Sequence, residues 1–200
     1  MKIAVFVSGR GSNLKAILDN PDLKNLIEVA AVISDKSDCK AFEIAGEYGI
    51  NYFSVGDGAE KIKQTEITTL LKKLEVSFIV LAGYLKLIPL DLIENFEKRI
   101  INIHPALLPS FGGKGMYGMN VHRAVFNFYA KVSGATVHMV DKTYDTGKII
   151  AQKCVDISDV KSPEEIAERV LKIEHQILPE VLKSFAEDKV RFESERIIIN

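Results

Sequence analysis

Hydrophobic residues in the first half of the chain form short apolar runs that alternate with stretches of helical spacing. The runs 3–7, 27–33, 52–55, 78–82 and 100–104 have the length and composition of strands, and those at 3–7, 78–82 and 100–104 are expected to be buried. Stretches 14–18, 41–48, 62–74 and 89–96 place apolar residues at the spacing of amphipathic helices. This alternation predicts an α/β fold with a doubly wound, mostly parallel, Rossmann-like sheet and right-handed crossovers.

The pattern changes after Pro109, and the second half of the chain does not repeat the strand–helix alternation. The predicted elements there are a glycine-rich loop at 111–118, a helix at 121–130, and strands at 135–140 and 148–157. Because a turn at 141–147 joins these two strands, we expect an added hairpin beside the parallel sheet.

A long C-terminal helix is predicted to begin at Ser162, which has the side chain of an N-cap residue. Pro163 suits the first helical position, and Glu165 suits the capping-box position. The helical pattern extends to about residue 188, and Pro179 is expected to kink or break it. Residues 190–199 are expected to add a last edge strand.

Composition is that of an ordinary soluble protein, with 47% hydrophobic and 26% charged residues. The formal net charge of -1 gives no electrostatic reason to expect a nucleic-acid partner. No run approaches the ~20 apolar residues of a membrane span, and the first residues lack signal-peptide anatomy. Cys39 and Cys154 lack CxxC spacing and are expected to be unpaired thiols, so we expect a cytoplasmic protein without a membrane partner.

The stretch 99–109, Arg-Ile-Ile-Asn-Ile-His-Pro-Ala-Leu-Leu-Pro, combines a buried strand with two polar residues at its end. Asn102 and His104 are two positions apart, so an extended backbone points both side chains to the same side. Pro105 should end the strand, because proline removes a backbone donor. Ligands of α/β sheets bind beyond the carboxyl ends of the strands. A catalytic pair and a structurally paired Asn and His are both compatible with this pattern.

The turn Ser8-Gly9-Arg10-Gly11-Ser12-Asn13 follows the first strand and opens a helix. Backbone N–H groups at a helix start favour an anion, and glycines let the anion approach closely. The dinucleotide fingerprint is incomplete because Leu14 stands where a third glycine would be, although Asp35 could still contact a ribose. The P-loop pattern is absent as well. We therefore expect a monophosphate site, with an unoccupied tight turn as the alternative.

Asp145 and the histidines carry little information when each is taken alone. Asp145 lies in a turn, His138 on an apolar strand, and His122 and His175 on predicted helices. The histidines have no H-x-x-x-H spacing, and with two cysteines they give no metal-binding signature. No metal is therefore expected.

Three segments together, 8–13, 102–109 and 145–147, resemble the folate-dependent formyltransferases. The run Asn-Ile-His-Pro-Ala-Leu-Leu-Pro is similar to the motif shared by enzymes that use 10-formyltetrahydrofolate. The Ser-Gly-Arg-Gly-Ser-Asn turn looks like the phosphate loop of the branch that formylates glycinamide ribonucleotide. The resemblance covers essentially the whole chain. It implies one formyltransferase domain over residues 1–200, with a phosphate and ribonucleotide half at 1–100 and a catalytic, folate-binding half at 101–200.

The resemblance also implies roles for the positions that match the family's motifs. Asn102, His104 and Asp145 match the catalytic trio. Residues Gly11, Ser12 and Asn13 would hold the substrate phosphate, and Glu174 would contact the substrate amine or ribose. The folate-binding positions would be Leu85, Lys86, Leu87, Ile88, Asn102, Val140, Asp141 and Asp145. A basic contact near the third helix is expected from Lys61 or Lys63, and the loop 111–120 is more glycine-rich than the common bacterial form.

The implied reaction moves the formyl group of 10-formyltetrahydrofolate to N1-(5-phospho-D-ribosyl)glycinamide in de novo purine (IMP) synthesis. The amine attacks directly and a tetrahedral intermediate forms, since no Ser or Cys has the setting of a nucleophile. Asn102 would donate a hydrogen bond to the oxyanion, and His104 would shuttle the proton. Asp145 is expected to orient the imidazole and to raise the pKa of His104. A monomer and a homodimer are both compatible with the sequence.

Three other functions are weighed against this one. The same residues could hydrolyse 10-formyltetrahydrofolate to formate, although the phosphate turn argues against it. A nicotinamide-dependent oxidoreductase would use Gly9, Gly11 and Asp35 but leaves the Asn102–Pro105 run unexplained. A non-catalytic nucleotide-binding module would bind the ribonucleotide without formyl transfer.

Overall fold

The computed structural model describes residues 1–194 and 196–200 and divides them into two compact units, Met1–Asn102 and Ile103–Asn200. Strands β1 to β7 belong to one sheet with the order β3-β2-β1-β4-β5-β6-β7, and β8 and β9 form a second, two-stranded sheet. Strand β5 (Ile100–His104) ends the first unit and begins the second. The predicted α/β class, with a mostly parallel sheet, an added hairpin and a long helix, is confirmed.

The first unit contains the parallel part of the sheet. Its strands are β1 (Lys2–Phe6), β2 (Glu28–Ser34), β3 (Asn51–Ser54) and β4 (Phe78–Leu81), followed by the start of β5. Strand β1 is central, because it pairs in parallel with β2 on one side and with β4 on the other. Strand β2 also pairs with β3, and β4 with β5. All carboxyl ends of these strands therefore point to the same edge, as the sequence predicts.

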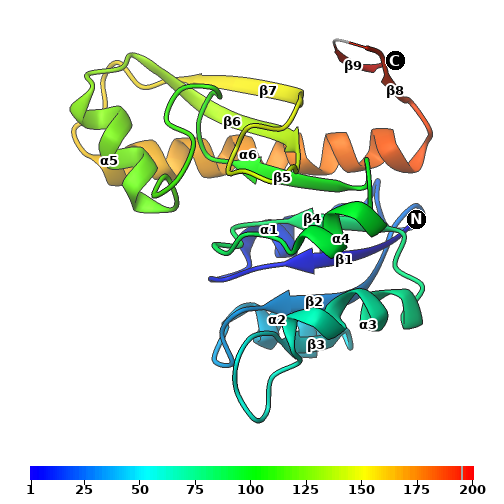
Figure 1. Ribbon diagram of the computed structural model, residues 1–200. Helices are drawn as coiled ribbons and strands as arrows, with labels where there is room; N and C mark the ends of the chain where they lie inside the picture. The colour runs from blue at the N-terminus through cyan, green and yellow to red at the C-terminus, as the bar shows by residue number, and fades with distance from the viewer. Residues whose placement is uncertain (195) are drawn as a thin grey trace. The chain divides into compact units, whose positions relative to one another are not determined.

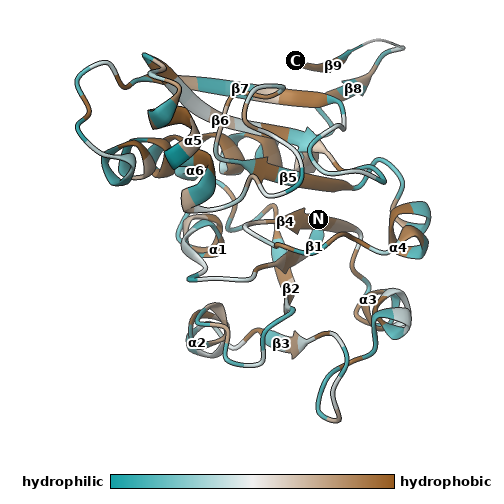
Figure 2. Ribbon diagram, turned by 60° about the vertical axis from the view of Figure 1, so that its left-hand side comes forward, coloured by the Kyte–Doolittle hydropathy of each residue, from teal (hydrophilic) through white to brown (hydrophobic). Residues whose placement is uncertain are grey.

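Helices cover both faces of this part of the sheet. They are α1 (Ser12–Leu18), α2 (Ala41–Glu47), α3 (Ile67–Lys73) and α4 (Leu90–Asn95). Figure 2 shows α1 and α2 on one side of β1 to β4, and α3 and α4 on the other, which is a doubly wound arrangement. Burial on both faces explains why the central strands are almost wholly apolar, as in β4, where all four residues are buried.

Two helix starts in the first unit differ from the predicted positions. The stripe expected from residue 62 begins with the 3-10 turn η1 (Gln64–Glu66), and the α-helix follows only at Ile67. All three residues of η1 are polar and none is buried, so no side chain packs an α-helical turn against the sheet there. Pro89 is the N-cap of α4 with an extended ψ of 142°, so it precedes the first helical position.

The second unit contains the predicted hairpin and the long helix. Helix α5 (Met119–Asn127) precedes β6 (Val132–Met139), which pairs antiparallel with β7 (Ile149–Asp156). Helix α6 (Pro163–Ala186) packs along the hairpin, as Figure 1 shows. Its start is the predicted one, because the Ser162 side chain accepts a hydrogen bond from the Glu165 N–H at 3.3 Å.

The predicted break at Pro179 is wrong, because α6 is one continuous helix with Pro179 inside it. A proline inside a helix costs about 3 kcal/mol, since one backbone hydrogen bond is lost and the ring crowds the preceding turn. The neighbours Ile177, Leu178, Val181 and Leu182 are all buried. Each such side chain contributes about 1.5–3 kcal/mol by burial, so the four together exceed the cost of the proline.

The predicted last edge strand is also wrong, because residues after α6 form a separate hairpin. Strand β8 (Val190–Phe192) pairs antiparallel with β9 (Ile197–Ile199), and the Glu193 N–H donates to the Arg196 carbonyl at 2.9 Å. Within 1–194 and 196–200, no helix is long and apolar enough to cross a membrane.

Candidate active site

The turn after β1 has the backbone that an anion site requires. Gly11 is the N-cap of α1 in the left-handed conformation, with φ 76°, and no side chain caps the helix. A Cβ at Gly11 would lie 2.8 Å from the Ala41 Cβ, so only glycine fits there. The first amides of an α-helix have no partner within the helix and present positive partial charge. A helix follows the turn as predicted, but it opens at Ser12, so Ser12 and Asn13 belong to the helix and not to the turn.

Ser8 joins this turn to the ends of the two neighbouring strands. Its hydroxyl donates to Asp35 Oδ1 at 2.6 Å and accepts from the Leu85 N–H at 3.0 Å. The Ser8 N–H donates to the Gly83 carbonyl at 3.0 Å. Asp35 therefore uses one carboxylate oxygen within the protein, and Lys61 donates to the Asp35 carbonyl at 2.7 Å. This network was not predicted from the sequence.

The segment that matches the family's folate-binding positions follows directly. Leu85 is half-buried, Lys86 and Leu87 are exposed, and Ile88 is buried. The Tyr84 ring packs edge-on against Phe6 with the ring centroids 5.3 Å apart. Burial, helped by the negative charge of Asp35, raises the pKa of Tyr84 to about 12. Three of the four residues 85–88 are therefore apolar, and Lys86 is the exposed cation among them.

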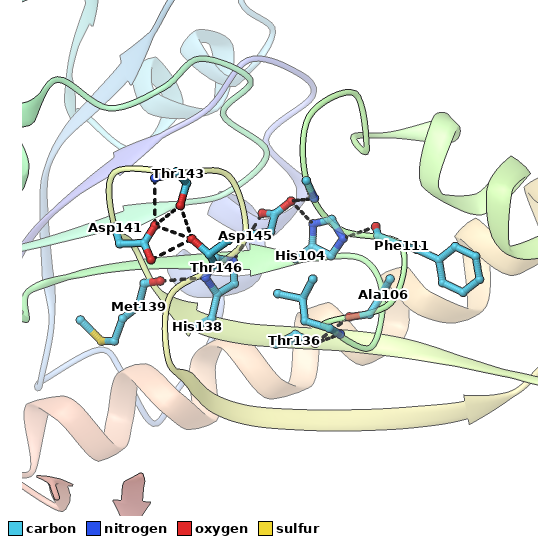
Figure 3. A network of polar contacts seen from close by, with 12 residues as sticks. His104, Ala106, Phe111, Thr136, His138, Met139, Asp141, Thr143, Asp145 and Thr146 are labelled. Atoms are coloured by element: carbon cyan, nitrogen blue, oxygen red, sulfur yellow. Dashed lines mark hydrogen bonds and ion pairs between the residues drawn. The ribbon is translucent and has the colours of Figure 1, made fainter. Parts of the chain in front are cut away.

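Strand β5 ends at His104, as predicted, and Pro105 follows it. Asn102 is half-buried and is the last residue of the first unit, whereas His104 is only 3% exposed and lies in the second. In the second unit the structure brings His104 and Asp145 together, with His104 Nδ1 3.5 Å from Asp145 Oδ2 (Figure 3). Two of the three predicted catalytic side chains are thereby in contact.

The other ring nitrogen of His104, Nε2, lies 2.9 Å from the Phe111 carbonyl oxygen. Because a carbonyl oxygen only accepts, Nε2 carries the hydrogen and Nδ1 faces Asp145. Burial lowers the pKa of His104, while Asp145 and the Phe111 carbonyl act in the opposite direction. The net shift is downward. The effect of Asp145 on this pKa has the predicted sign, but burial outweighs it.

Asp145 lies between two histidines rather than against one. Its Oδ1 is 3.6 Å from His138 Nε2, and its Oδ2 accepts the Gly113 N–H at 2.9 Å. His138 Nδ1 in turn donates to the Met139 carbonyl at 2.8 Å. Burial raises the pKa of Asp145, but the hydrogen bond with His138, the charge of His104 and the Gly113 N–H outweigh it and lower the pKa. The carboxylate is therefore held ionised.

His138 and Gly113 were missed by reasoning from the sequence. His138 was expected in the core, and it is indeed 2% exposed on β6. The signal that could have identified it is its position near the end of β6, seven residues before Asp145. His122 is a further buried histidine, with no hydrogen-bond partner at Nδ1 among the residues described. Burial, helped by the charge of His104, lowers the pKa of His122 to about 4.

A cavity of about 380 Å³ opens beside Asp145 in the second unit. Its walls are both apolar and polar, and they consist of Leu108, Pro109, Gly112, Gly113, Tyr144, Asp145, Thr146, Gly147 and Ile149. Ligand pockets typically have volumes of about 300–1,000 Å³, largely apolar walls and a few fixed polar groups. The volume of the cavity falls within this range.

The loop around Asp141 is held by the Asp141 side chain itself. Its Oδ1 accepts the Thr143 N–H at 2.9 Å, the Thr143 hydroxyl at 3.1 Å and the Thr146 hydroxyl at 2.8 Å (Figure 3). The carboxylate of this predicted folate-binding residue thus faces its own loop. Val140 is half-buried, and Glu174 is buried on α6.

Cys39 and Cys154 are free thiols, as predicted. In the part of the chain that the structure describes, no group of three or more His, Cys, Asp or Glu side chains could hold a metal ion.

The chain matches the family model described as formyl transferase over residues 1–182. It is 42% identical over 201 residues to the chloroplastic phosphoribosylglycinamide formyltransferase of Arabidopsis thaliana, covering 98% of this chain and 69% of that protein. With the Bacillus subtilis phosphoribosylglycinamide formyltransferase it shares 39% identity, covering 91% of this chain and 93% of that one.

The solved structures give the same result. The phosphoribosylglycinamide formyltransferase of Anaplasma phagocytophilum superimposes with a TM-score of 0.89 at 31% identity, covering 100% of this chain and 93% of that chain. Sequence and structure therefore agree over nearly the whole length. The chain belongs to the phosphoribosylglycinamide formyltransferase family of formyl transferases.

Proposed function

We propose that the chain transfers the formyl group of 10-formyltetrahydrofolate directly to the amine of glycinamide ribonucleotide, with Asn102, His104 and Asp145 as its catalytic residues. The products are formylglycinamide ribonucleotide and tetrahydrofolate, and both units are taken as halves of one domain. The observation that carries the residue assignment is the contact of His104 with Asp145 beside the cavity.

The ribonucleotide phosphate is proposed to bind at Gly11, Ser12 and Asn13. The backbone of this turn presents helix amides, and a Cβ at Gly11 would clash with Ala41, so the turn keeps the open backbone that an anion needs. Glu174 is proposed to contact the substrate amine or ribose. A carboxylate suits either group because it accepts hydrogen bonds only.

His104 is proposed to take the proton from the attacking amine. Its lowered pKa keeps it neutral at pH 7 and therefore ready to act as a base. Uptake at Nδ1 leaves the Nε2–H on the Phe111 carbonyl and creates a cation 3.5 Å from Asp145 Oδ2. Asp145 stabilises this cation as an ion partner, and the proton can then pass to N10 of the folate as the intermediate collapses.

Asn102 is proposed to donate a hydrogen bond to the oxyanion of the tetrahedral intermediate. It stands two positions before His104 on β5, at the end of a strand whose carboxyl edge lies beside the other strand ends of its unit. A side-chain amide suits this role because it remains a donor at every pH at which the enzyme works.

The folate is proposed to use Leu85, Lys86, Leu87 and Ile88 in one unit and Val140, Asp141 and Asp145 in the other. The exposed Leu87 and the half-buried Leu85 offer apolar surface, and Lys86 offers a cation for an acidic group. In the second unit, the loop that Asp141 stabilises forms a wall of the cavity. Lys61 and Lys63 remain candidates for a basic contact.

The test is to mix the protein with both substrates and to follow the folate absorbance, with formate measured in parallel. We expect formylglycinamide ribonucleotide to appear in step with tetrahydrofolate, and EDTA to have no effect, since no metal is proposed. Formate release without the ribonucleotide would instead support hydrolysis. A Ser12→Ala, Asn13→Ala variant should lose affinity for the ribonucleotide more than for folate, and unchanged ribonucleotide affinity would refute the phosphate site.

The cellular setting is part of the proposal. A cytoplasmic enzyme is proposed from the composition, while the curated plant relative is named chloroplastic. A monomer or a homodimer is proposed, with no nucleic-acid or membrane partner, and sedimentation of the purified protein would determine which of the two forms.

A further inference from the structure

Ser8 connects the segments that follow the two neighbours of the central strand. It lies just beyond β1, the central strand, whose neighbours are β2 on one side and β4 on the other. Its side chain is only 3% exposed. The strand ladders stop at this edge, so the segments that leave β2 and β4 have only side-chain and loop contacts to fix them.

The Ser8 hydroxyl donates one hydrogen bond and accepts another at this edge of the sheet. It donates to Asp35 Oδ1, directly after β2, at 2.6 Å, and accepts from the Leu85 N–H, four residues after β4, at 3.0 Å. A donor directed at a carboxylate leaves the hydroxyl lone pair for the amide, so Asp35 orients the hydroxyl that holds Leu85. The Ser8 N–H also binds the Gly83 carbonyl at 3.0 Å.

We propose that Ser8 is a positioning residue that fixes the folate-binding segment 83–88 to the phosphate turn, with Asp35 orienting its hydroxyl. This inference rests on the proposed function, because it takes segment 83–88 as the folate contact. The hydroxyl holds the Leu85 backbone, whereas the turn at Gly11 is held by α1 and by its packing on Ala41. Loss of the hydroxyl therefore weakens folate binding and leaves phosphate binding intact.

The expected size follows from the number of hydrogen bonds lost. Ser8→Ala removes the acceptor of the Leu85 N–H, and one such bond corresponds to about 3- to 10-fold in an equilibrium constant. We expect the KM for 10-formyltetrahydrofolate to rise by this factor. The KM for the ribonucleotide and kcat should stay within about 2-fold, because no group that contacts the reacting atoms has changed.

A matched control lies in the same unit. Ser77 donates its hydroxyl to the Lys2 carbonyl at 3.0 Å, at the opposite end of β1. Ser77→Ala removes a comparable bond and should leave both KM values unchanged. Asp35→Ala is the second variant, which serves if Ser8→Ala does not fold. It should raise the folate KM by a smaller factor, and the double variant should match Ser8→Ala, because the two residues act in series.

The experiment measures both KM values and kcat for the wild type and these variants, together with titration of tetrahydrofolate. Equal rises in both KM values, additive effects of Ser8→Ala and Asp35→Ala, or a rise in the Ser77→Ala control would overturn the inference. A wild type that does not transfer formyl would overturn the proposed function instead. The inference would then depend on the titration, where an unchanged tetrahydrofolate affinity in Ser8→Ala would overturn it.

Discussion

The charge of Asp145 is the feature whose removal tests the mechanism most directly. Asp145→Asn keeps the shape of the side chain and an oxygen for the Gly113 N–H, but removes the negative charge 3.5 Å from His104 Nδ1. At that separation a unit charge stabilises the imidazolium by ~1 kcal/mol at a dielectric constant of about 80 and by ~5 kcal/mol at about 20. Each 1.36 kcal/mol is about tenfold in rate. We therefore expect kcat to fall by ~10- to 10³-fold.

The pH dependence of kcat/KM provides a second, independent test of the role of Asp145. In the wild type, burial holds the pKa of His104 below its usual 6.5, and Asp145 limits the shift. Without the carboxylate, the pKa should fall further, so the acid limb of kcat/KM should move to lower pH.

The assay is steady-state formyl transfer measured as a function of pH, with Asp159→Asn as the control. Asp159 is an exposed carboxylate of the same unit that pairs with Arg169 at 2.7 Å. A kcat within about 2-fold of the wild type, or an acid limb that moves to higher pH, would refute the role given to Asp145.

Three further predictions concern stability and the shape of the site. His122 has a pKa of about 4 in the folded state and 6.5 in the unfolded state, so the unfolded state binds more protons between these values and acid destabilises the fold. Between pH 7 and 5, the free energy of unfolding measured with urea should fall by about 2 kcal/mol more in the wild type than in His122→Gln. Equal decreases in the two proteins would contradict this account. A Cβ at Gly112 would lie 2.4 Å from Leu108 Cδ2 and 3.3 Å from Asp145 Cβ, so Gly112→Ala should cost about 1–3 kcal/mol and lower kcat, whereas Gly46→Ala, with open space around it in α2, should be stabilising in the same thermal melts. Asp141→Ala frees Thr143 and Thr146 and should raise the folate KM about 10-fold, while Asp141→Asn, which keeps an acceptor, should recover most of the affinity; equal effects of the two would assign the role to the charge instead.

Most of the fold could be predicted because local pattern and tertiary environment agree. The wholly apolar run of β4 is buried on both faces, and Ser162 caps α6 through a hydrogen bond with Glu165, only three positions away in the sequence. The errors occurred where the two disagree. Pro179 carries a strong local signal to end a helix, and only the burial of its neighbours, which the one-dimensional pattern does not weigh, overrides it.

The site was less predictable, because its contacts join distant residues. The family resemblance led to His104 and Asp145, which are 41 positions apart, whereas periodicity alone gave a strand end and a turn. The contact of His104 with the Phe111 carbonyl depends on the path of a glycine-rich loop, which carries no periodic signal. The Ser8 network was accessible in principle, since Ser8 and Asp35 each follow a strand whose carboxyl end lies at the same edge.

The direction of the His104 pKa shows what a sequence cannot weigh. A nearby carboxylate favours the imidazolium, whereas burial favours the neutral ring and is the larger effect here. The sequence names the carboxylate, but the burial to 3% exposure exists only once β5 is packed. Burial prevails, and the pKa of His104 is lowered, so the ring favours its neutral form. In the proposed mechanism, His104 is therefore the base before proton transfer, and Asp145 stabilises the cation that forms afterwards, which a histidine with a raised pKa would not do at pH 7.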